Sequence, residues 1–346
     1  MESSNGQDRA PIIVEAPDTR AYPPPRYWAA AYPRRRGSLL LAITLFLITV
    51  VSTLAVGAQF ALAYANNQAP FSGDFNLLGF YAAILSEPGL LLLGVPFSFT
   101  LLGILLAHEL GHFYACRFYG IAASYPYFIP APTLIGTMGA FIRIRSPIVN
   151  RKALFDVGLA GPVVGFLFAL PALAIAMAYS KVIPAAQVES TIFFGHSLLE
   201  RAFAAVCHPG VRVENIFLHP VGRAAWVGLF ATALNLIPAG QLDGGHIVYS
   251  VASEKHRRIS LVVATALILL GGPAMIASFG VPMPHLLASQ WPGWAFWGVL
   301  LLALGFRHPP LLDRWEPIDA KRRVWAAIAV LIFAVCFMPV PFVILD

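Results

Sequence analysis

The chain has 346 residues, of which 58% are hydrophobic and only 12% are charged. Soluble domains usually carry about 25% charged residues, so the composition excludes an ordinary soluble protein and indicates a polytopic membrane protein. The net charge of +6 does not indicate a nucleic-acid partner, because the basic residues are concentrated in alternate loops between the apolar segments, as on one side of a membrane. The three cysteines are far apart and form no CxxC pair, so no disulfide framework is predicted.

Residues 1–37 are rich in Pro, Arg and Ala, and we expect a disordered cytoplasmic arm there. Hydropathy then predicts seven membrane spans in chain order: Leu39–Tyr64, Gly89–Tyr114, Leu154–Tyr179, Ala224–Val248, Ile259–Phe279, Leu286–Phe306 and Val324–Ile344. Gln290, Pro292 and Gly293 interrupt the sixth segment. Whether 286–306 crosses the membrane fully is therefore open, and a re-entrant segment is the alternative.

The basic residues predict the orientation of these spans. With the N-terminus inside, 19 of the 23 Lys and Arg residues fall in inside segments, and only Lys181, Arg201, Arg212 and Arg223 fall outside. This asymmetry follows the positive-inside rule, so we predict an integral, multi-pass protein with a cytoplasmic N-terminus. In a Gram-negative cell this location would be the inner membrane.

The second span ends in the sequence HELGH, which places ionisable groups at membrane depth. His108 and His112 lie roughly 8–14 Å below the cytoplasmic end of the span, counted back from Arg117 at ~1.5 Å per residue. On a helix the two imidazoles share one face and can bind one Zn²⁺, with Glu109 placed to act as a general base. The structural alternative is a pair of histidines hydrogen-bonded at a helix interface.

A catalytic zinc usually has three protein ligands, and two acids are candidates for the third. Asp243 precedes the next inside charge, Glu254, by eleven residues, which gives it a depth similar to that of the histidines. Asp156 follows Arg151 and Lys152 closely and is expected to sit or pair at the interface. We therefore predict Asp243 as the third ligand.

The sequence around Asp243 predicts a break in the fourth span. Pro238 removes a backbone donor, and Gly240, Gly244 and Gly245 weaken the helix further. Irregular backbone at this depth is tolerated where it is buried in protein or faces water. The amides of Asn235 and Gln241 could bind a carbonyl or an oxyanion there. A kinked structural helix is the alternative, and a role for His246 beside the metal is left open.

These motifs resemble those of the site-2 protease family of intramembrane zinc metalloproteases, peptidase M50-like. HELGH matches the family's HExxH, and NLIPAGQLDG matches its Asn-x-x-Pro-x-x-x-Leu-Asp-Gly motif. The resemblance implies one Zn²⁺ per chain bound by His108, His112 and Asp243, with Glu109 as acid/base and Asn235 as an oxyanion donor. It also implies a transmembrane protein or peptide as substrate. The short loop at about 180–223 resembles the PDZ-less branch, and the oligomeric state is not predicted.

The segment Ser124–Ile148 reads as short strands, because prolines and glycines precede the alternating residues Phe141 to Arg145. GTMGAF at 136–141 resembles the family's re-entrant segment. A strand edge there could pair with an extended substrate, whereas the alternative is an ordinary interfacial loop.

The predicted fold is an all-α polytopic membrane protein with about six or seven transmembrane helices, a three-helix catalytic core and a short re-entrant β-like segment. We divide it into the arm 1–37, a metalloprotease core at 38–250 and C-terminal helices at 251–346. The predicted function is intramembrane zinc endopeptidase. The alternatives are an inactive pseudoprotease that binds membrane helices, a transporter, which should show an internal repeat, and a diiron enzyme, which would need more histidines at this depth.

Overall fold

The computed structural model describes residues 37–71, 77–148, 150–184, 192–304, 311, 313 and 316–344. Nearly all of the predicted arm at 1–37 lies outside this range. The helices are α2 (Gly37–Asn66), α3 (Leu77–Ser86), η1 (Pro88–Gly94), α4 (Val95–Phe118), α5 (Arg151–Ala178), α6 (Leu198–Cys207), η3 (Val213–Asn215), α7 (Pro220–Asn235), α8 (Asp243–Ala277), α9 (His285–Ala288), α10 (Gly293–Leu304) and α11 (Ala320–Cys336). The strands are β1 (Tyr127–Pro130), β2 (Thr137–Phe141), β3 (Lys181–Val182), β4 (Ile192–Phe194), β5 (Ile216–Phe217) and β6 (Phe342–Ile344).

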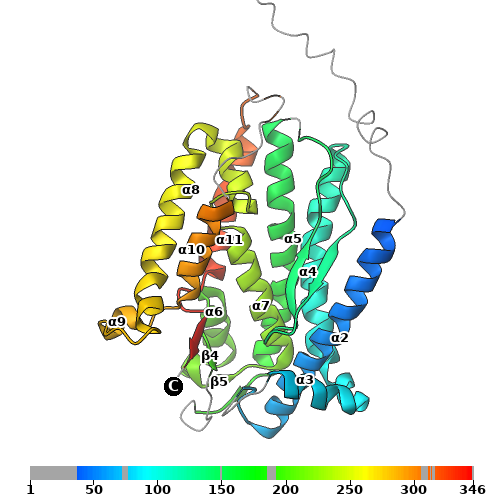
Figure 1. The fold of residues 1–346 in the computed structure, drawn as a ribbon, viewed down its shortest axis with the longest axis vertical. Helices are drawn as coiled ribbons and strands as arrows, with labels where there is room; N and C mark the ends of the chain where they lie inside the picture. Colours follow the sequence, from blue (N-terminus) through cyan, green and yellow to red (C-terminus); the bar gives the residue numbers. More distant parts are fainter. Residues whose placement is uncertain are drawn as a thin grey trace, which may run out of the picture.

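The long helices run roughly side by side as a bundle (Figure 1). Within the described residues, four apolar helical segments of 28 to 35 residues are long enough to cross a membrane. Many large apolar side chains on their outer faces are exposed, among them Leu40, Phe99 and Leu269. Such surfaces are rare on soluble monomers and suit lipid, so the predicted all-α polytopic fold class is confirmed.

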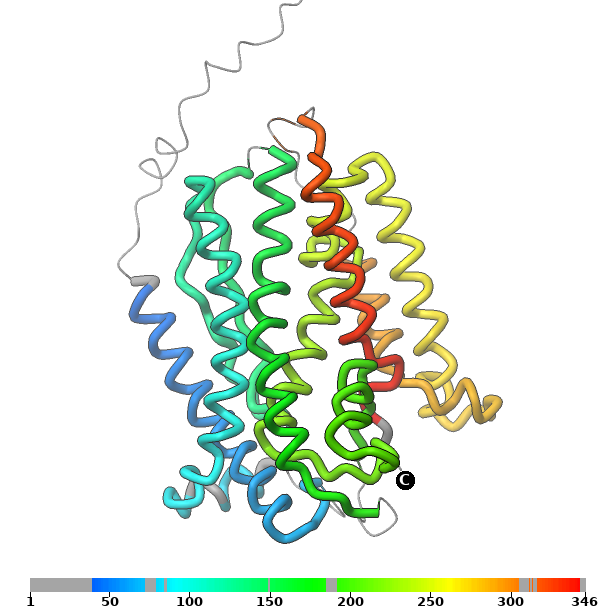
Figure 2. The backbone as a smooth tube through the Cα atoms, turned by 180° about the vertical axis from the view of Figure 1, so that it is seen from behind, coloured from blue at the N-terminus to red at the C-terminus, as the bar shows by residue number. Residues whose placement is uncertain are grey.

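Helix α5 lies at the centre of the packing. It contacts α4, α7, α8 and α11, and Figure 2 shows it between α4 and α11. Small residues allow the close approach of α4: a Cβ atom added at Gly111 would lie 2.6 Å from the carbonyl oxygen of Ala160. Close packing through small residues is how membrane helices associate without a hydrophobic driving force.

The predicted fourth span is broken, as the sequence indicates. Helix α7 ends at Asn235, a tight turn follows with Gly240 at φ 59°, and α8 begins at Asp243. A second break follows within α8, where Ala252 has φ −141° and ψ 59°. The chain therefore reverses, and the part of α8 after Ala252 returns along the bundle (Figure 1).

Two strands lie between α4 and α5 in the sequence and form an antiparallel hairpin. Strand β1 packs on α2, and β2 contacts α4 and α2. Ser52 of α2 donates a hydrogen bond to the carbonyl of Gly136 at 2.6 Å. The hairpin lies within the segment predicted to contain strands. Its second strand ends at Phe141, so the alternating residues after it form only the isolated bridge at Ile144.

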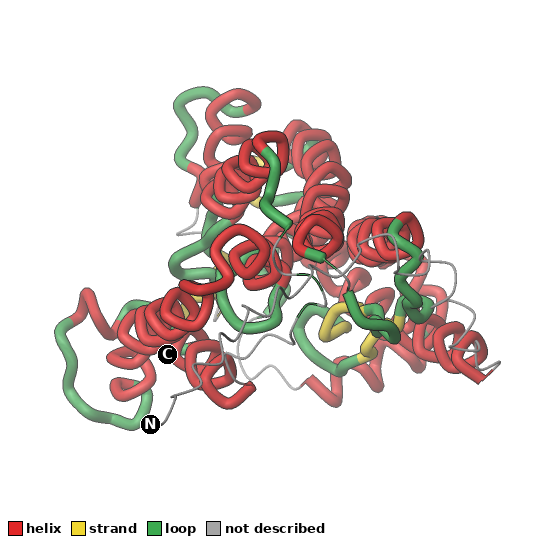
Figure 3. Tube along the Cα trace, turned by 90° about the horizontal axis from the view of Figure 1, so that it is seen from above, coloured by secondary structure: helices red, strands yellow, loops and turns green. Residues whose placement is uncertain are grey.

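The sixth predicted segment is the least regular part of the bundle. Helix α9 covers four residues and α10 twelve, Gly293–Leu304, which amounts to about 18 Å of helix. A bilayer core is about 30 Å thick, so α10 alone does not cross it. The break between α9 and α10 coincides with Gln290 and Pro292. Figure 3 shows the bundle seen along the helices.

Candidate metal centre

Helix α4 presents two buried imidazoles to the interior of the bundle. His108 and His112 are one turn apart, and their Nε2 atoms lie 3.0 Å from each other. Both residues also face the third predicted ligand, because Oδ2 of Asp243 is 3.4 Å from Nε2 of His108 and 3.3 Å from Nε2 of His112. The structure thus brings all three predicted ligands together from α4 and from the first residue of α8.

The spacing of these atoms matches the needs of a zinc ion. Zinc bonds of about 2.0–2.2 Å in a tetrahedron place ligand atoms roughly 3.3–3.5 Å apart. The three donor atoms fall close to that separation, and two imidazoles with one carboxylate is a donor set that zinc uses. It is also the one group of three or more potential ligands within the described part of the chain.

The backbone and the glycines of α5 fix the orientation of the imidazoles. Nδ1 of His112 lies 2.7 Å from the carbonyl oxygen of Val157, so this nitrogen carries the proton and Nε2 is left free to bind a metal. Gly161 and Gly165 leave room for the rings. A Cβ atom at Gly161 would lie 2.1 Å from Nε2 of His112, and one at Gly165 would lie 3.1 Å from Nδ1 of His108.

The returning part of α8 supports the turn that leads to Asp243. The amide of Gly240 donates to Oγ of Ser260 at 3.1 Å, and Nε2 of His256 lies 3.1 Å from the carbonyl oxygen of Gly240. Both side chains are buried. Buried backbone groups without partners are costly, so these two contacts stabilise the irregular turn. The reversal at Ala252 is what brings them there.

The two other predicted site residues also lie at the cluster. Glu109 follows His108 on α4 and is buried, and the backbone of Ile142, just after β2, hydrogen-bonds to its carboxylate. Nδ2 of Asn235, at the end of α7, lies 3.2 Å from Nε2 of His108. The roles of these residues stay predictions, but their positions suit them.

Asp156 is not part of the cluster of predicted ligands, and it forms an ion pair elsewhere in the bundle, as its position in the sequence indicates. Its carboxylate accepts two hydrogen bonds from Arg322 of α11, at 2.9 Å and 2.5 Å, and a third from the hydroxyl of Tyr119. Arg322 also bonds to Asp319, which caps α11. These contacts fasten α11 to α5. His246 packs its Cβ against Gly158 of α5, and its role beside the metal stays a prediction.

Sequence reasoning missed the residues around the ligands, namely Gly158, Gly161, Gly165, His256 and Ser260. The three glycines follow a spacing of three and four residues in an apolar span, which is a signal for a close helix contact. His256 and Ser260 carry no such signal, because the reversal that brings them to the turn is not marked by Pro or Gly at Ala252.

Comparison with known proteins agrees with this geometry. The chain is 29% identical over 322 residues to a protein named probable zinc metalloprotease EGY1, chloroplastic, of Arabidopsis thaliana, covering 87% of this chain and 53% of the relative. It is 30% identical over 253 residues to the Arabidopsis protein named probable zinc metalloprotease EGY2, chloroplastic, covering 72% of this chain and 42% of the relative. The chain thus spans about half the length of these relatives.

A family model covers the site itself. The model for peptidase family M50 matches residues 96–279, which include α4, α5, α7 and α8 with all three predicted ligands. The match extends over more than half of the chain. The expected membership is therefore confirmed: the chain belongs to peptidase family M50.

Proposed function

We propose that the protein is a zinc endopeptidase that hydrolyses a peptide bond within or near the transmembrane segment of a membrane-protein substrate. The observation that carries the proposal is the buried cluster of His108, His112 and Asp243 with Glu109 beside it, set within a bundle of helices long enough to cross a bilayer. Ionisable groups at such positions are costly and are usually retained for function.

The three ligands would hold one zinc ion and leave a fourth position for water. Zinc, when bound, polarises a substrate carbonyl and makes the bound water more acidic. The carboxylate of Glu109 would take a proton from that water and pass it to the nitrogen of the leaving peptide. The Nδ2 amide of Asn235 would donate a hydrogen bond to the carbonyl oxygen as negative charge develops there.

Strand β2 is the element we expect to position the substrate. A helical segment hides its carbonyls in its own hydrogen bonds, so the scissile bond must first be extended. Within the described sheets β2 pairs only with β1, which leaves it a second edge for an added strand. The backbone just after β2 reaches the carboxylate of Glu109. Pairing along this edge would bring an extended carbonyl close to the site.

The edge can be tested at Met138, whose side chain is 68% exposed. A proline there removes one backbone donor of β2, whereas alanine keeps it. We expect Met138→Pro to lose cleavage and retain zinc, with Met138→Ala close to wild type. Equal cleavage by both variants would show that the substrate does not pair with the edge of β2.

We further propose that the N-terminus is cytoplasmic and that the site lies nearer the cytoplasmic side, on the basis of the 19 inside and four outside basic residues. Single cysteines at Arg212 and Arg257, both exposed, would report the two faces. A membrane-impermeant thiol reagent added to whole cells should label the first and not the second. The reverse pattern would show the opposite orientation.

The function is tested by measuring bound zinc and cleavage together. Wild type and Glu109→Gln are reconstituted in liposomes with a panel of single-span membrane proteins, and zinc per chain is quantified. We expect about one zinc in both proteins and cleavage only by wild type. Folded protein that binds no zinc at saturating metal would overturn the proposal and favour the inactive membrane-helix binder.

A further inference from the structure

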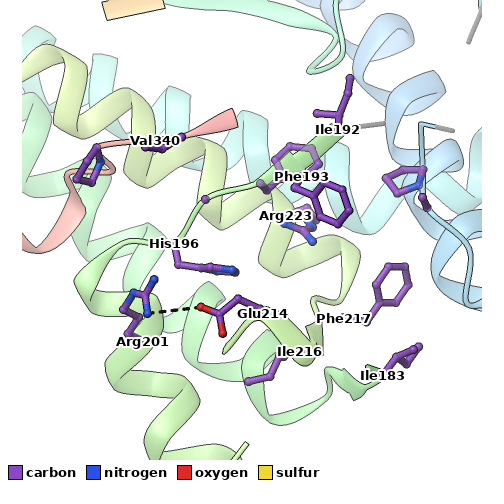
Figure 4. Close-up of a pocket in the computed structure, with 15 residues that line it drawn as sticks. Ile183, Ile192, Phe193, His196, Arg201, Glu214, Ile216, Phe217, Arg223 and Val340 are labelled. Atoms are coloured by element: carbon purple, nitrogen blue, oxygen red, sulfur yellow. Dashed lines mark ion pairs between the residues drawn. The ribbon is translucent and has the colours of Figure 1, made fainter. Parts of the chain in front are cut away.

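A second site lies at the lower end of the bundle in Figure 1, in a pocket of about 450 Å³. Its walls come from β4, β5 and the segments around Pro70 and Val340, and it includes none of the predicted metal ligands. The pocket therefore belongs to a different part of the molecule from the metal cluster. Figure 4 shows the side chains that line it.

Arg223, in the first turn of α7, is the unusual group in this pocket. Its Nη1 atom is buried and has no hydrogen-bond partner among the described residues, while its guanidinium carbon lies 4.5 Å from the ring centroid of Phe194. An arginine stays charged in proteins, and a buried donor without a partner costs stability. The pocket thus contains a cation with an unused donor.

The other charged groups near the pocket lie close to one another. Oε1 of Glu200 lies 3.0 Å from Nδ1 of His196, and the same carboxylate attracts the charge of Arg223, although it leaves Nη1 without a hydrogen bond. Glu214 lies 3.8 Å from Arg201 and 3.4 Å from Arg212. A hydrogen bond from its own backbone amide lowers the pKa of Glu214, so it is an anion at neutral pH. Two carboxylates around the pocket would repel a doubly charged ligand, and a single negative charge fits better.

The remaining surface of the pocket is apolar. Phe193 comes from β4 and Ile216 and Phe217 from β5, and in Figure 4 they surround the same hollow as Arg223 and Glu214. We propose that this pocket binds a monocarboxylate that carries an apolar chain, with its carboxylate on Arg223 and its chain against β4 and β5. A free fatty acid and the carboxyl terminus of an apolar peptide both have this chemistry.

The proposal can be tested by binding alone, without any protease assay. The full chain in nanodiscs is titrated calorimetrically with acetate, butyrate, hexanoate and the neutral hexanamide, against empty nanodiscs. Affinity should rise about fourfold for each methylene buried. Hexanamide should bind at least tenfold more weakly than hexanoate, because it lacks the charge that Arg223 recognises.

Variants localise the binding. Arg223→Gln should weaken hexanoate at least tenfold, whereas Arg212→Gln, at a side chain that is 81% exposed and outside the pocket, should not. Bound zinc and thermal unfolding check that each variant is folded. If Arg223→Gln does not fold, the chain-length series and the acid–amide pair on wild type decide the question.

A short peptide ending in Val-Phe, supplied as free acid and as amide, distinguishes the two possible ligands, a fatty acid and the carboxyl terminus of a peptide. Binding of the free acid alone, in competition with hexanoate, indicates a peptide terminus, and binding of hexanoate without the peptide indicates a fatty acid. Equal affinity for acid and amide forms, or no saturable binding of any acid, would overturn the proposal.

Discussion

Gly161 of α5 offers a sharp test of the metal centre, because a single added methyl group meets the ring of a predicted ligand. A Cβ atom there would lie 2.1 Å from Nε2 of His112 and 2.5 Å from two ring carbons. Ordinary contact begins near 3.4 Å, so the ring must move by about 1.3 Å. Metal–ligand distances tolerate only about 0.2 Å, so His112 could no longer bind in place.

We therefore expect Gly161→Ala to weaken zinc binding at least a hundredfold, or about 2.7 kcal/mol. Helix propensity does not explain such a loss, since alanine in a helix is favoured over glycine by about 1 kcal/mol. Two matched variants test whether the loss of zinc affinity follows the closeness of the added methyl group to a ligand ring. Gly165→Ala, whose Cβ would lie 3.1 Å from His108, should cost less, and Gly103→Ala, with no atom within 4 Å, should cost nothing.

The assay is competition for zinc against a chelator of known affinity, with circular dichroism to verify the fold. Zinc affinity that is the same in Gly161→Ala and Gly103→Ala would refute the reasoning, because it would mean that the ring of His112 is not held against α5 at the metal site.

Three other predictions concern residues around the same centre. Asn235→Ala should lower the turnover number by about 10²–10³ if its amide stabilises the oxyanion, with zinc content unchanged; a loss of zinc instead would make it a structural residue. Ser260→Ala should weaken zinc binding by about 10-fold to 100-fold through the turn at Gly240; unchanged affinity in the chelator assay would show that the turn holds without it. Arg322→Gln should lower the thermal midpoint and leave zinc affinity close to wild type, because this side chain ties α11 to Asp156 of α5 and not to the metal; a large loss of zinc would contradict that separation.

The grouping of the three predicted ligands could be anticipated from the sequence, because the signals that mark them are local. His108 and His112 are one turn apart on any helix, and the depth of Asp243 follows from counting residues to the next inside charge. Asp156 could be excluded as a metal ligand because Arg151 and Lys152 lie close to it in the sequence. In the structure it pairs with Arg322. Pro238 and Gly240 likewise predicted the break in the fourth span.

The parts that escaped prediction depend on contacts between distant segments. The reversal at Ala252 has no Pro or Gly to mark it, and only the packing of α8 on α5 and α10 explains it. The close contact of Gly161 with the ring of His112 likewise cannot be predicted before α4 is placed against α5. A glycine in an apolar span can serve many structural purposes. Hydropathy also joins the apolar residues of α9 and α10 into one sixth segment, whereas the structure separates them into two helices.

The distribution of the predicted ligands over α4 and α8 has a consequence for the order of events during synthesis. His112 precedes Asp243 by 131 residues, which a ribosome translating about 5–20 residues per second needs roughly 7–26 s to make. During that interval two imidazoles are inserted without their carboxylate partner. With these three residues as the ligands, zinc capture would be a late step, completed only after the chain has turned at Gly240 and α8 has begun at Asp243. Zinc loading would then report the successful assembly of the bundle.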